Sequence, residues 1–194
     1  MKLRQIIFVL LLATASATAQ TLAVNTNDTK TGSRLILTKN HKGKEITVDD
    51  SVAKNGLVFF SAGYQANTVT NKEVKIFYID LDIYHHNNTI GCIKQSENNL
   101  ILILEDGSEM QCFQMSDTDC SQEAYKAAFA LNNKNGSFEE NEKNFKKLQT
   151  VGITKIKVTT TETTQEYKTT SKSREYIKAH FALVAKTLNA GAVK

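Results

Sequence analysis

The chain has 194 residues, carries a formal net charge of +4 and contains neither proline nor tryptophan. Its lysines are scattered and often stand beside acidic residues, a pattern typical of a solvated surface, which excludes the basic patch of a nucleic-acid-binding protein. The absence of proline excludes polyproline ligands and proline-rich linkers.

The first 19 residues have the pattern of a cleavable secretory signal peptide. Lys2 and Arg4 give a positive start, an apolar run extends from Ile6 to Ala13, and Ala17-Thr18-Ala19 offers small residues at the cleavage site. The apolar run is shorter than the roughly 20 residues that cross a bilayer. Since the leader resembles those of Gram-negative bacteria, we expect a periplasmic or secreted protein with no transmembrane segment after cleavage. An uncut N-terminal anchor is the alternative.

After the leader, residues 20–33 are polar and predict a flexible lead-in. Residues 34–190 then have the length of one domain. Short strands are expected at Leu35–Thr38, Glu45–Val48 and Leu57–Ala62, separated by clusters of Asn, Gly and Lys. The first half of the domain is therefore predicted to be rich in strands.

A long strand is predicted over Val74–His86, because its residues alternate between apolar and polar. One face carries apolar residues and should lie on the core: Phe77, Ile79, Leu81 and Ile83. The other face carries Tyr78, Asp80, Asp82, Tyr84 and His86.

Two apolar runs, residues 100–104 and 109–113, flank the dipeptide Asp106-Gly107. Asp-Gly between apolar runs is a strong hairpin signal, since both central residues of a type I′ turn need positive φ. We therefore expect a hairpin with a type I′ turn here.

The periodicity of the second half indicates helices and one more hairpin. A helical spacing of Tyr125, Ala128 and Phe129 predicts a helix over Gln122–Leu131. The capping-box pattern of Ser137-Phe138-Glu139-Glu140 predicts a second helix from Phe138 to about Gln149. Threonine-rich strands follow at Ile153–Thr160 and Thr163–Thr169. The last segment, Arg174–Leu188, places Ile177, Phe181, Val184 and Leu188 on one stripe, as expected of an amphipathic helix.

These elements predict an α+β fold. We expect a mostly antiparallel sheet with two to three helices, of which the C-terminal helix packs on the sheet.

Three cysteines in an oxidising compartment predict one disulfide and one free thiol. Cys112 falls within a strand pattern on the same face as Met110, which favours a buried, unpaired residue. Cys92 and Cys120 stand near strand ends or loops and are the preferred pair, although the spacing leaves the other pairings open.

The polar face of the 74–86 strand is the candidate site. Asp80 and Asp82 would stand about 7 Å apart along the strand, flanked by Tyr78, Tyr84 and His86. Two carboxylates at that distance can bind a hard cation with the help of loop oxygens or divide acid and base roles. They can also belong to a solvated sheet face, or to a contact surface in which tyrosines supply rigid amphipathic area.

No metal or cofactor is predicted. His85 and His86 point to opposite faces of a continuing strand, and the third and fourth ligands of a zinc site have no evident source.

The sequence contains no motif that assigns a reaction. We expect an exported, non-enzymatic domain that binds a protein, a glycan or a cell-envelope component through Tyr78, Asp80, Asp82, Tyr84 and His86. One alternative is a small hydrolase or cation-dependent enzyme that uses the Asp80 and Asp82 pair, and a second is a structural component of the envelope or matrix. Oligomeric state leaves no mark in the sequence.

Overall fold

The computed structural model describes residues 20–39, 57–70, 72–84, 91–94, 97–116, 118 and 124–191. Within them, nine strands form one antiparallel sheet in the order β1-β2-β3-β4-β7-β6-β5-β8-β9. The elements are β1 (Leu22–Asp28), β2 (Ser33–Thr38), β3 (Leu57–Val69), β4 (Lys72–Tyr84), β5 (Leu100–Leu104), β6 (Glu109–Gln114), β7 (Ala124–Ala130), α2 (Phe138–Leu148), β8 (Ile153–Thr159), β9 (Thr164–Lys168) and α3 (Ser171–Gly191). The predicted fold class is confirmed. The predicted leader and the expected strand at Glu45–Val48 lie outside the described residues.

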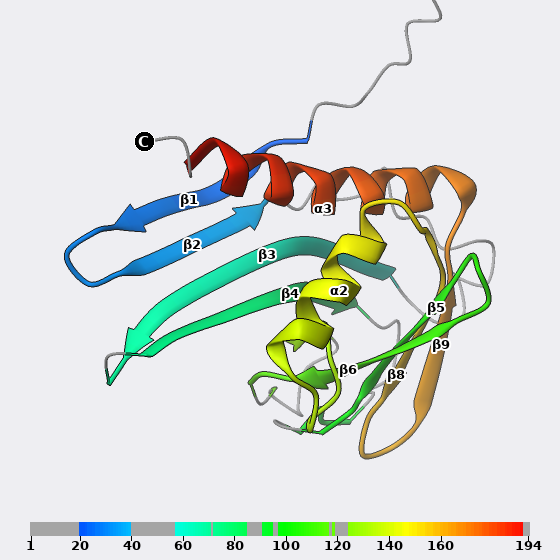
Figure 1. The fold of residues 1–194 in the computed structure, drawn as a ribbon. Coiled ribbons are helices and arrows are strands. Elements are labelled where there is room, and N and C mark those ends of the chain that lie inside the picture. Colours follow the sequence, from blue (N-terminus) through cyan, green and yellow to red (C-terminus); the bar gives the residue numbers. More distant parts are fainter. Residues whose placement is uncertain are drawn as a thin grey trace, which may run out of the picture.

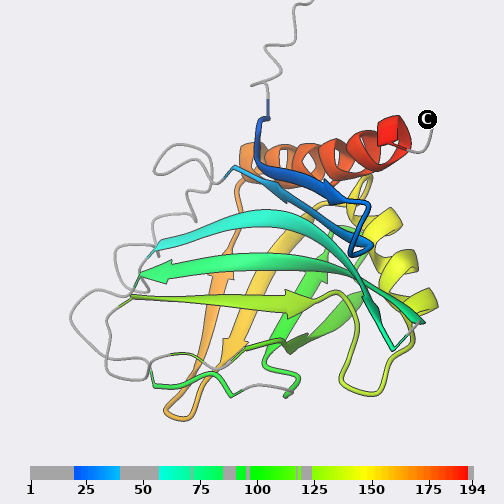
Figure 2. The ribbon, with the colours of Figure 1, turned by 90° about the vertical axis from the view of Figure 1, so that its left-hand side faces the viewer.

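The sheet curves around the C-terminal helix (Figure 1). Helix α3 contacts β2 and β3 in one half of the sheet and β8 in the other half. Helix α2 lies beside it and contacts both β4 and α3. In the view turned by 90°, α3 runs across one edge of the curved sheet and α2 borders its open side (Figure 2). This arrangement divides the sheet into an inner face, which meets the helices, and an outer face.

The inner face of the sheet and one stripe of α3 form the core. As predicted, Ile177, Phe181 and Val184 of α3 are fully buried. They belong to one buried cluster with inner-face residues of every strand from β2 to β9, among them Ile36, Phe60, Ile79, Leu81, Phe129, Cys112, Leu102, Ile156 and Tyr167. A stripe every three to four residues matches one face of a helix, whereas alternate residues match one face of a strand. The two periods in the sequence therefore meet in one core.

Helix α2 begins where the capping box predicted. The side chain of Ser137 accepts a hydrogen bond from the backbone N–H of Glu140 at 3.2 Å, which satisfies one of the free N–H groups of the first turn. Phe145 and Leu148 are buried, and the ring of Phe145 stacks on Phe77 of β4 with ring centres 3.8 Å apart. This stacking holds α2 against β4.

A buried histidine joins α3 to the sheet. Nδ1 of His180 lies 2.6 Å from the hydroxyl oxygen of Thr38 in β2, and this oxygen also accepts the backbone N–H of Ala62 at 2.9 Å. The imidazole packs against the rings of Phe60 and Tyr176. The hydrogen bond and the ring contacts give His180 a structural role in the core.

Two sequence predictions are wrong. Residues 22–28, expected in a flexible lead-in, form the edge strand β1, which pairs with β2 from Leu22↔Thr38 to Asp28↔Ser33. Residues 124–130, expected in a helix, form β7 between β4 and β6. In both segments, backbone pairing with a distant or neighbouring strand outweighs the local preference of the side chains.

The hairpin between β5 and β6 is confirmed, but its turn is not type I′. The backbone N–H of Gly107 donates to the carbonyl of Leu104 at 3.1 Å. Within the turn only Gly107 has positive φ, at 80°, whereas a type I′ turn needs positive φ at two residues. Asp106 instead uses its side chain to accept the N–H of Ser108 at 3.0 Å.

Among the described residues, no helix is long and apolar enough to cross a membrane. Cys112 is a free, fully buried thiol, and Cys92 is disulfide-bonded. Cys120 lies outside the described residues, so its pairing with Cys92 stays a prediction.

Thiol titration tests this pairing. Burial raises the pKa of the Cys112 thiol strongly, which makes the reactive thiolate scarce. We expect a water-soluble disulfide reagent to label no thiol in the folded protein. In denaturant without reductant, it should label one thiol per wild-type chain and none in Cys112→Ala. Labelling of three thiols in the denatured wild-type chain would contradict the predicted disulfide.

Candidate functional site

Strand β4 gathers three of the predicted site residues on the outer face of the sheet. Tyr78, Asp80 and Asp82 alternate with inner-face residues that belong to the core. Their neighbours on β3 and β7 are mostly small: Gly63 and Ala130 pair with Tyr78, and Ser61 and Ala128 pair with Asp80. Asp82 pairs with Phe59 and Lys126. The site thus has a floor of small residues around two carboxylates and one tyrosine.

The ring of Tyr78 lies across Gly63. A Cβ atom added at Gly63 would stand 2.1 Å from Cζ of Tyr78, so this position of the ring requires a glycine. Tyr78 is only 8% exposed. Burial, followed by the nearby charge of Asp80, raises the pKa of Tyr78 to about 12. Tyr78 is therefore a neutral wall of the site at neutral pH.

Among the described residues, Lys126 is the cation that lies near both carboxylates. Nζ of Lys126 lies 3.4 Å from Oδ2 of Asp82, which is itself 7% exposed. Burial, followed by repulsion from Asp82, raises the pKa of Asp80 to about 6, while Lys126 acts in the opposite direction. Of the described residues, Lys126 is thus the cation that lies beside the two acids.

The remaining predicted site residues are placed only in part. The backbone of Tyr84 ends β4, opposite Leu57 and Ala124, but its side chain lies outside the described part of the chain. His86 and its neighbour His85 lie outside it too.

Asp80 and Asp82 provide fewer ligands than a metal site needs. Within the described ranges, no group of three or more His, Cys, Asp or Glu side chains is placed to hold a metal ion. Asp80 and Asp82 alone would leave most positions of a calcium or magnesium ion to other oxygen ligands.

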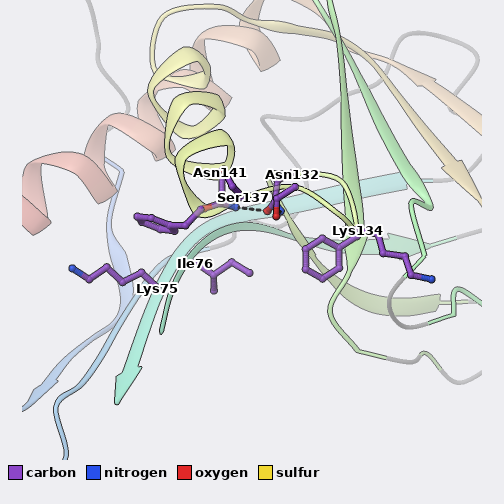
Figure 3. Close-up of a pocket in the computed structure, with 9 residues that line it drawn as sticks. Lys75, Ile76, Asn132, Lys134, Ser137 and Asn141 are labelled. Atoms are coloured by element: carbon purple, nitrogen blue, oxygen red, sulfur yellow. Dashed lines mark hydrogen bonds between the residues drawn. The ribbon is translucent and has the colours of Figure 1, made fainter. Parts of the chain in front are cut away.

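A cavity of about 220 Å³ lies at the start of α2 (Figure 3). Asn141 and Asn132 meet there through a 2.9 Å hydrogen bond, and Lys75 and Lys134 stand at its two sides. Both polar atoms of the Asn141 side-chain amide are engaged by the protein, since Oδ1 accepts the N–H of Phe77 and Nδ2 donates to its carbonyl, each at 2.8 Å. These contacts make Asn141 a link between α2 and β4.

A second cavity, of about 420 Å³, lies between the β1–β2 hairpin and the C-terminal half of α3. Neither cavity is lined by Tyr78, Asp80 or Asp82.

Lys126 and the small residues around the carboxylates are not among the residues predicted from the sequence. Lys126 follows from reading residues 124–130 as a strand, because it then alternates with the buried Ala127 and Phe129. That period-2 pattern is masked by four alanines, which favour a helix. Ser61 and Gly63 carry no signal of their own, since their place opposite Asp80 and Tyr78 comes from the β3–β4 register.

Comparison with protein-family models, with curated proteins and with solved structures finds no match.

Proposed function

We propose that this chain is an exported, non-enzymatic binding domain, periplasmic or secreted, that captures its partner at the outer face of β4. The observation that supports the proposal is the pair of carboxylates of Asp80 and Asp82. They lie among small residues of the neighbouring strands, and among the described residues Lys126 is the cation beside them. Tyr78 bounds the pair along the strand. A site of this charge favours a ligand that carries a positive group.

The partner follows from the charge of the site. A half-buried, ionised Asp80 beside Asp82 is unfavourable unless a positive charge approaches it. An ammonium or guanidinium group of a partner supplies this charge together with several hydrogen-bond donors. We infer that the partner is a protein of the envelope or the extracellular space that presents a lysine or arginine side chain.

Binding suits this geometry better than hydrolysis. The ring of Tyr78 lies across Gly63, and the two cavities described above are lined by other residues. A hydrolase needs room for a substrate and a water molecule between its acid and its base.

A titration with tetralysine tests the proposal. The chain from residue 20 onward should bind tetralysine, measured by calorimetry at low salt and pH 8, where Asp80 is ionised. Asp80→Asn should weaken binding at least tenfold, because the group that attracts the cation loses its charge. Glu73→Gln is the matched control, since Glu73 is an exposed acid on the same strand that already pairs with Lys75 at 2.8 Å. Equal affinities of the wild type and Asp80→Asn would overturn the proposal.

A further inference from the structure

The groove between the β1–β2 hairpin and α3 has the size and chemistry of a second binding site. Its volume of about 420 Å³ falls in the range of small-molecule sites. The residues that line it come from β1, β2 and the C-terminal half of α3: Leu22, Asn25, Asn27, Arg34, Leu183, Lys186, Thr187, Ala190 and Gly191. Two of them are cationic and none is acidic.

Arg34 is anchored with part of its guanidinium still available. Nη1 donates to the carbonyl of Thr26 at 3.1 Å, and Nη2 lies 3.7 Å from the place that a Cβ atom of Gly191 would take. A guanidinium has five N–H donors in a rigid fork, and one bond to a carbonyl leaves most of them for a ligand. The hairpin therefore holds a fixed cation at the wall of the groove.

Within the described part of the chain, neither Arg34 nor Lys186 has a carboxylate within ion-pair distance. Arg174, by contrast, pairs with Glu105 at 3.3 Å. The acid nearest to the groove along β1 is Asp28, and its side chain accepts the backbone N–H groups of Lys30 and Thr31 in the hairpin turn. The positive charge of the groove is thus not balanced by acids from its own hairpin.

The other polar groups of the groove favour a hydroxylated ligand. Asn25 and Asn27 stand two residues apart on β1, so their amides share the face that meets α3. Each amide can donate to one hydroxyl and accept from another. The hydroxyl of Thr187 donates to the carbonyl of Leu183 at 2.8 Å and keeps its acceptor positions. None of the described residues that line the groove is aromatic, so they offer no stacking platform for a nucleotide base.

We propose that this groove binds an acidic saccharide, with Arg34 and Lys186 holding its carboxylate and Asn25 and Asn27 holding its hydroxyls. Arg34 can meet a carboxylate with two parallel hydrogen bonds, which gives orientation as well as charge. The proposal stands apart from the one for β4, because the two sites differ in place and in the sign of their charge.

The test uses the chain from residue 20 onward, labelled with nitrogen-15 and titrated with a galacturonate tetrasaccharide at low salt. We expect the amide signals of Asn25, Asn27, Thr187 and Ala190 to shift on binding. Lys186→Glu should weaken binding at least tenfold, since an exposed cation of the groove becomes an anion. Lys143→Glu is the control, because Lys143 is an exposed lysine of α2 outside the groove.

The comparison ligands separate charge from sugar recognition. A neutral maltose-type tetrasaccharide and inorganic phosphate should each bind at least tenfold more weakly than the galacturonate. Asp80→Asn should leave galacturonate binding unchanged, so that failure at β4 and failure at the groove are told apart. The proposal is overturned if the galacturonate shifts no groove amide at millimolar concentration, if phosphate alone binds as tightly, or if Lys186→Glu and Lys143→Glu have equal effects.

Discussion

Asn141→Ala should lower the free energy of unfolding by about 2–4 kcal/mol, because it removes a hydrogen-bonded group from a buried site and leaves a backbone N–H without its acceptor. Asn141 is 1% exposed. Its side chain bonds to both backbone groups of Phe77 and to Oδ1 of Asn132. Urea unfolding followed by circular dichroism should show a lower midpoint with an unchanged slope.

Asn141 is important because β7 ends before it reaches Phe77 of β4. Strand β7 pairs with β4 only from Tyr84 down to Tyr78, opposite Ala130. At Phe77, the next residue along β4, Leu131 supplies one N–H to the carbonyl at 3.1 Å, and the amide of Asn141 supplies the rest of what a strand would offer. A helix side chain thus completes the hydrogen bonding of the sheet at this point.

Asn144→Ala is the matched control on the same helix. Nδ2 of Asn144 donates a single hydrogen bond, 2.7 Å long, to the carbonyl of Leu131 from a half-buried position. Its loss should cost about 1 kcal/mol. If Asn141→Ala costs no more than Asn144→Ala, Asn141 does not have the role assigned to it.

The parts of the fold that sequence reasoning predicted are those with local causes. The capping box at Ser137 fixes the start of α2, and the stripe from Ile177 to Leu188 marks the buried face of α3. Period-2 alternation marks β4, whose Ile79 and Leu81 enter the core. In each case the signal and the structure lie within one element, so a single sequence is enough.

The errors concern segments whose structure depends on distant partners. Strand β7 is rich in alanine, which favours a helix, but its backbone is paired on one side with β4 and on the other with β6. Strand β1 is mostly exposed and polar, so it has almost no apolar pattern to reveal it. The placing of β7 between β4 and β6 requires contacts across tens of residues that no local pattern encodes.

The same distinction applies to the two candidate sites. The shared face of Tyr78, Asp80 and Asp82 follows from the alternation of one strand, and the structure places these three residues on one face. The burial of Asp82 and the nearness of Lys126 come from the neighbouring strand. The groove at Arg34 and Lys186 joins residues about 150 positions apart in the chain, a pairing that only the fold produces.

Asp80→Asn should stabilise the protein at pH 8 by about 2 kcal/mol and have almost no effect near pH 4. The pKa of Asp80 is raised from 3.8 to about 6, mainly by burial. The folded protein therefore binds the proton more tightly than the unfolded chain, and the wild type loses stability as the pH rises from about 4 to above 6. A shift of about two pKa units corresponds to roughly 3 kcal/mol, which we reduce to about 2 because the carboxyl retains some contact with water. Asparagine never ionises, so the variant does not lose this stability.

Asp106→Asn should change stability in the opposite direction and therefore tests the predicted sign of the Asp80→Asn effect. Lys147, followed by Ser108, holds the pKa of Asp106 well below its usual range, with Nζ of Lys147 2.8 Å from Oδ2. Asp106→Asn should therefore lower stability at neutral pH, and the loss should vanish as the pH falls through the lowered pKa. Urea unfolding at pH 4, 6 and 8 measures the effect of Asp80→Asn, and a second series from pH 4 down to pH 2 measures the decline of the Asp106→Asn effect. A protein tends to retain a destabilising acid when that acid serves binding. If Asp80→Asn is more stable than the wild type and no longer binds tetralysine, the loss of stability caused by ionised Asp80 is linked to the proposed function of β4. An Asp80→Asn effect that does not change with pH would remove the electrostatic basis of that proposal.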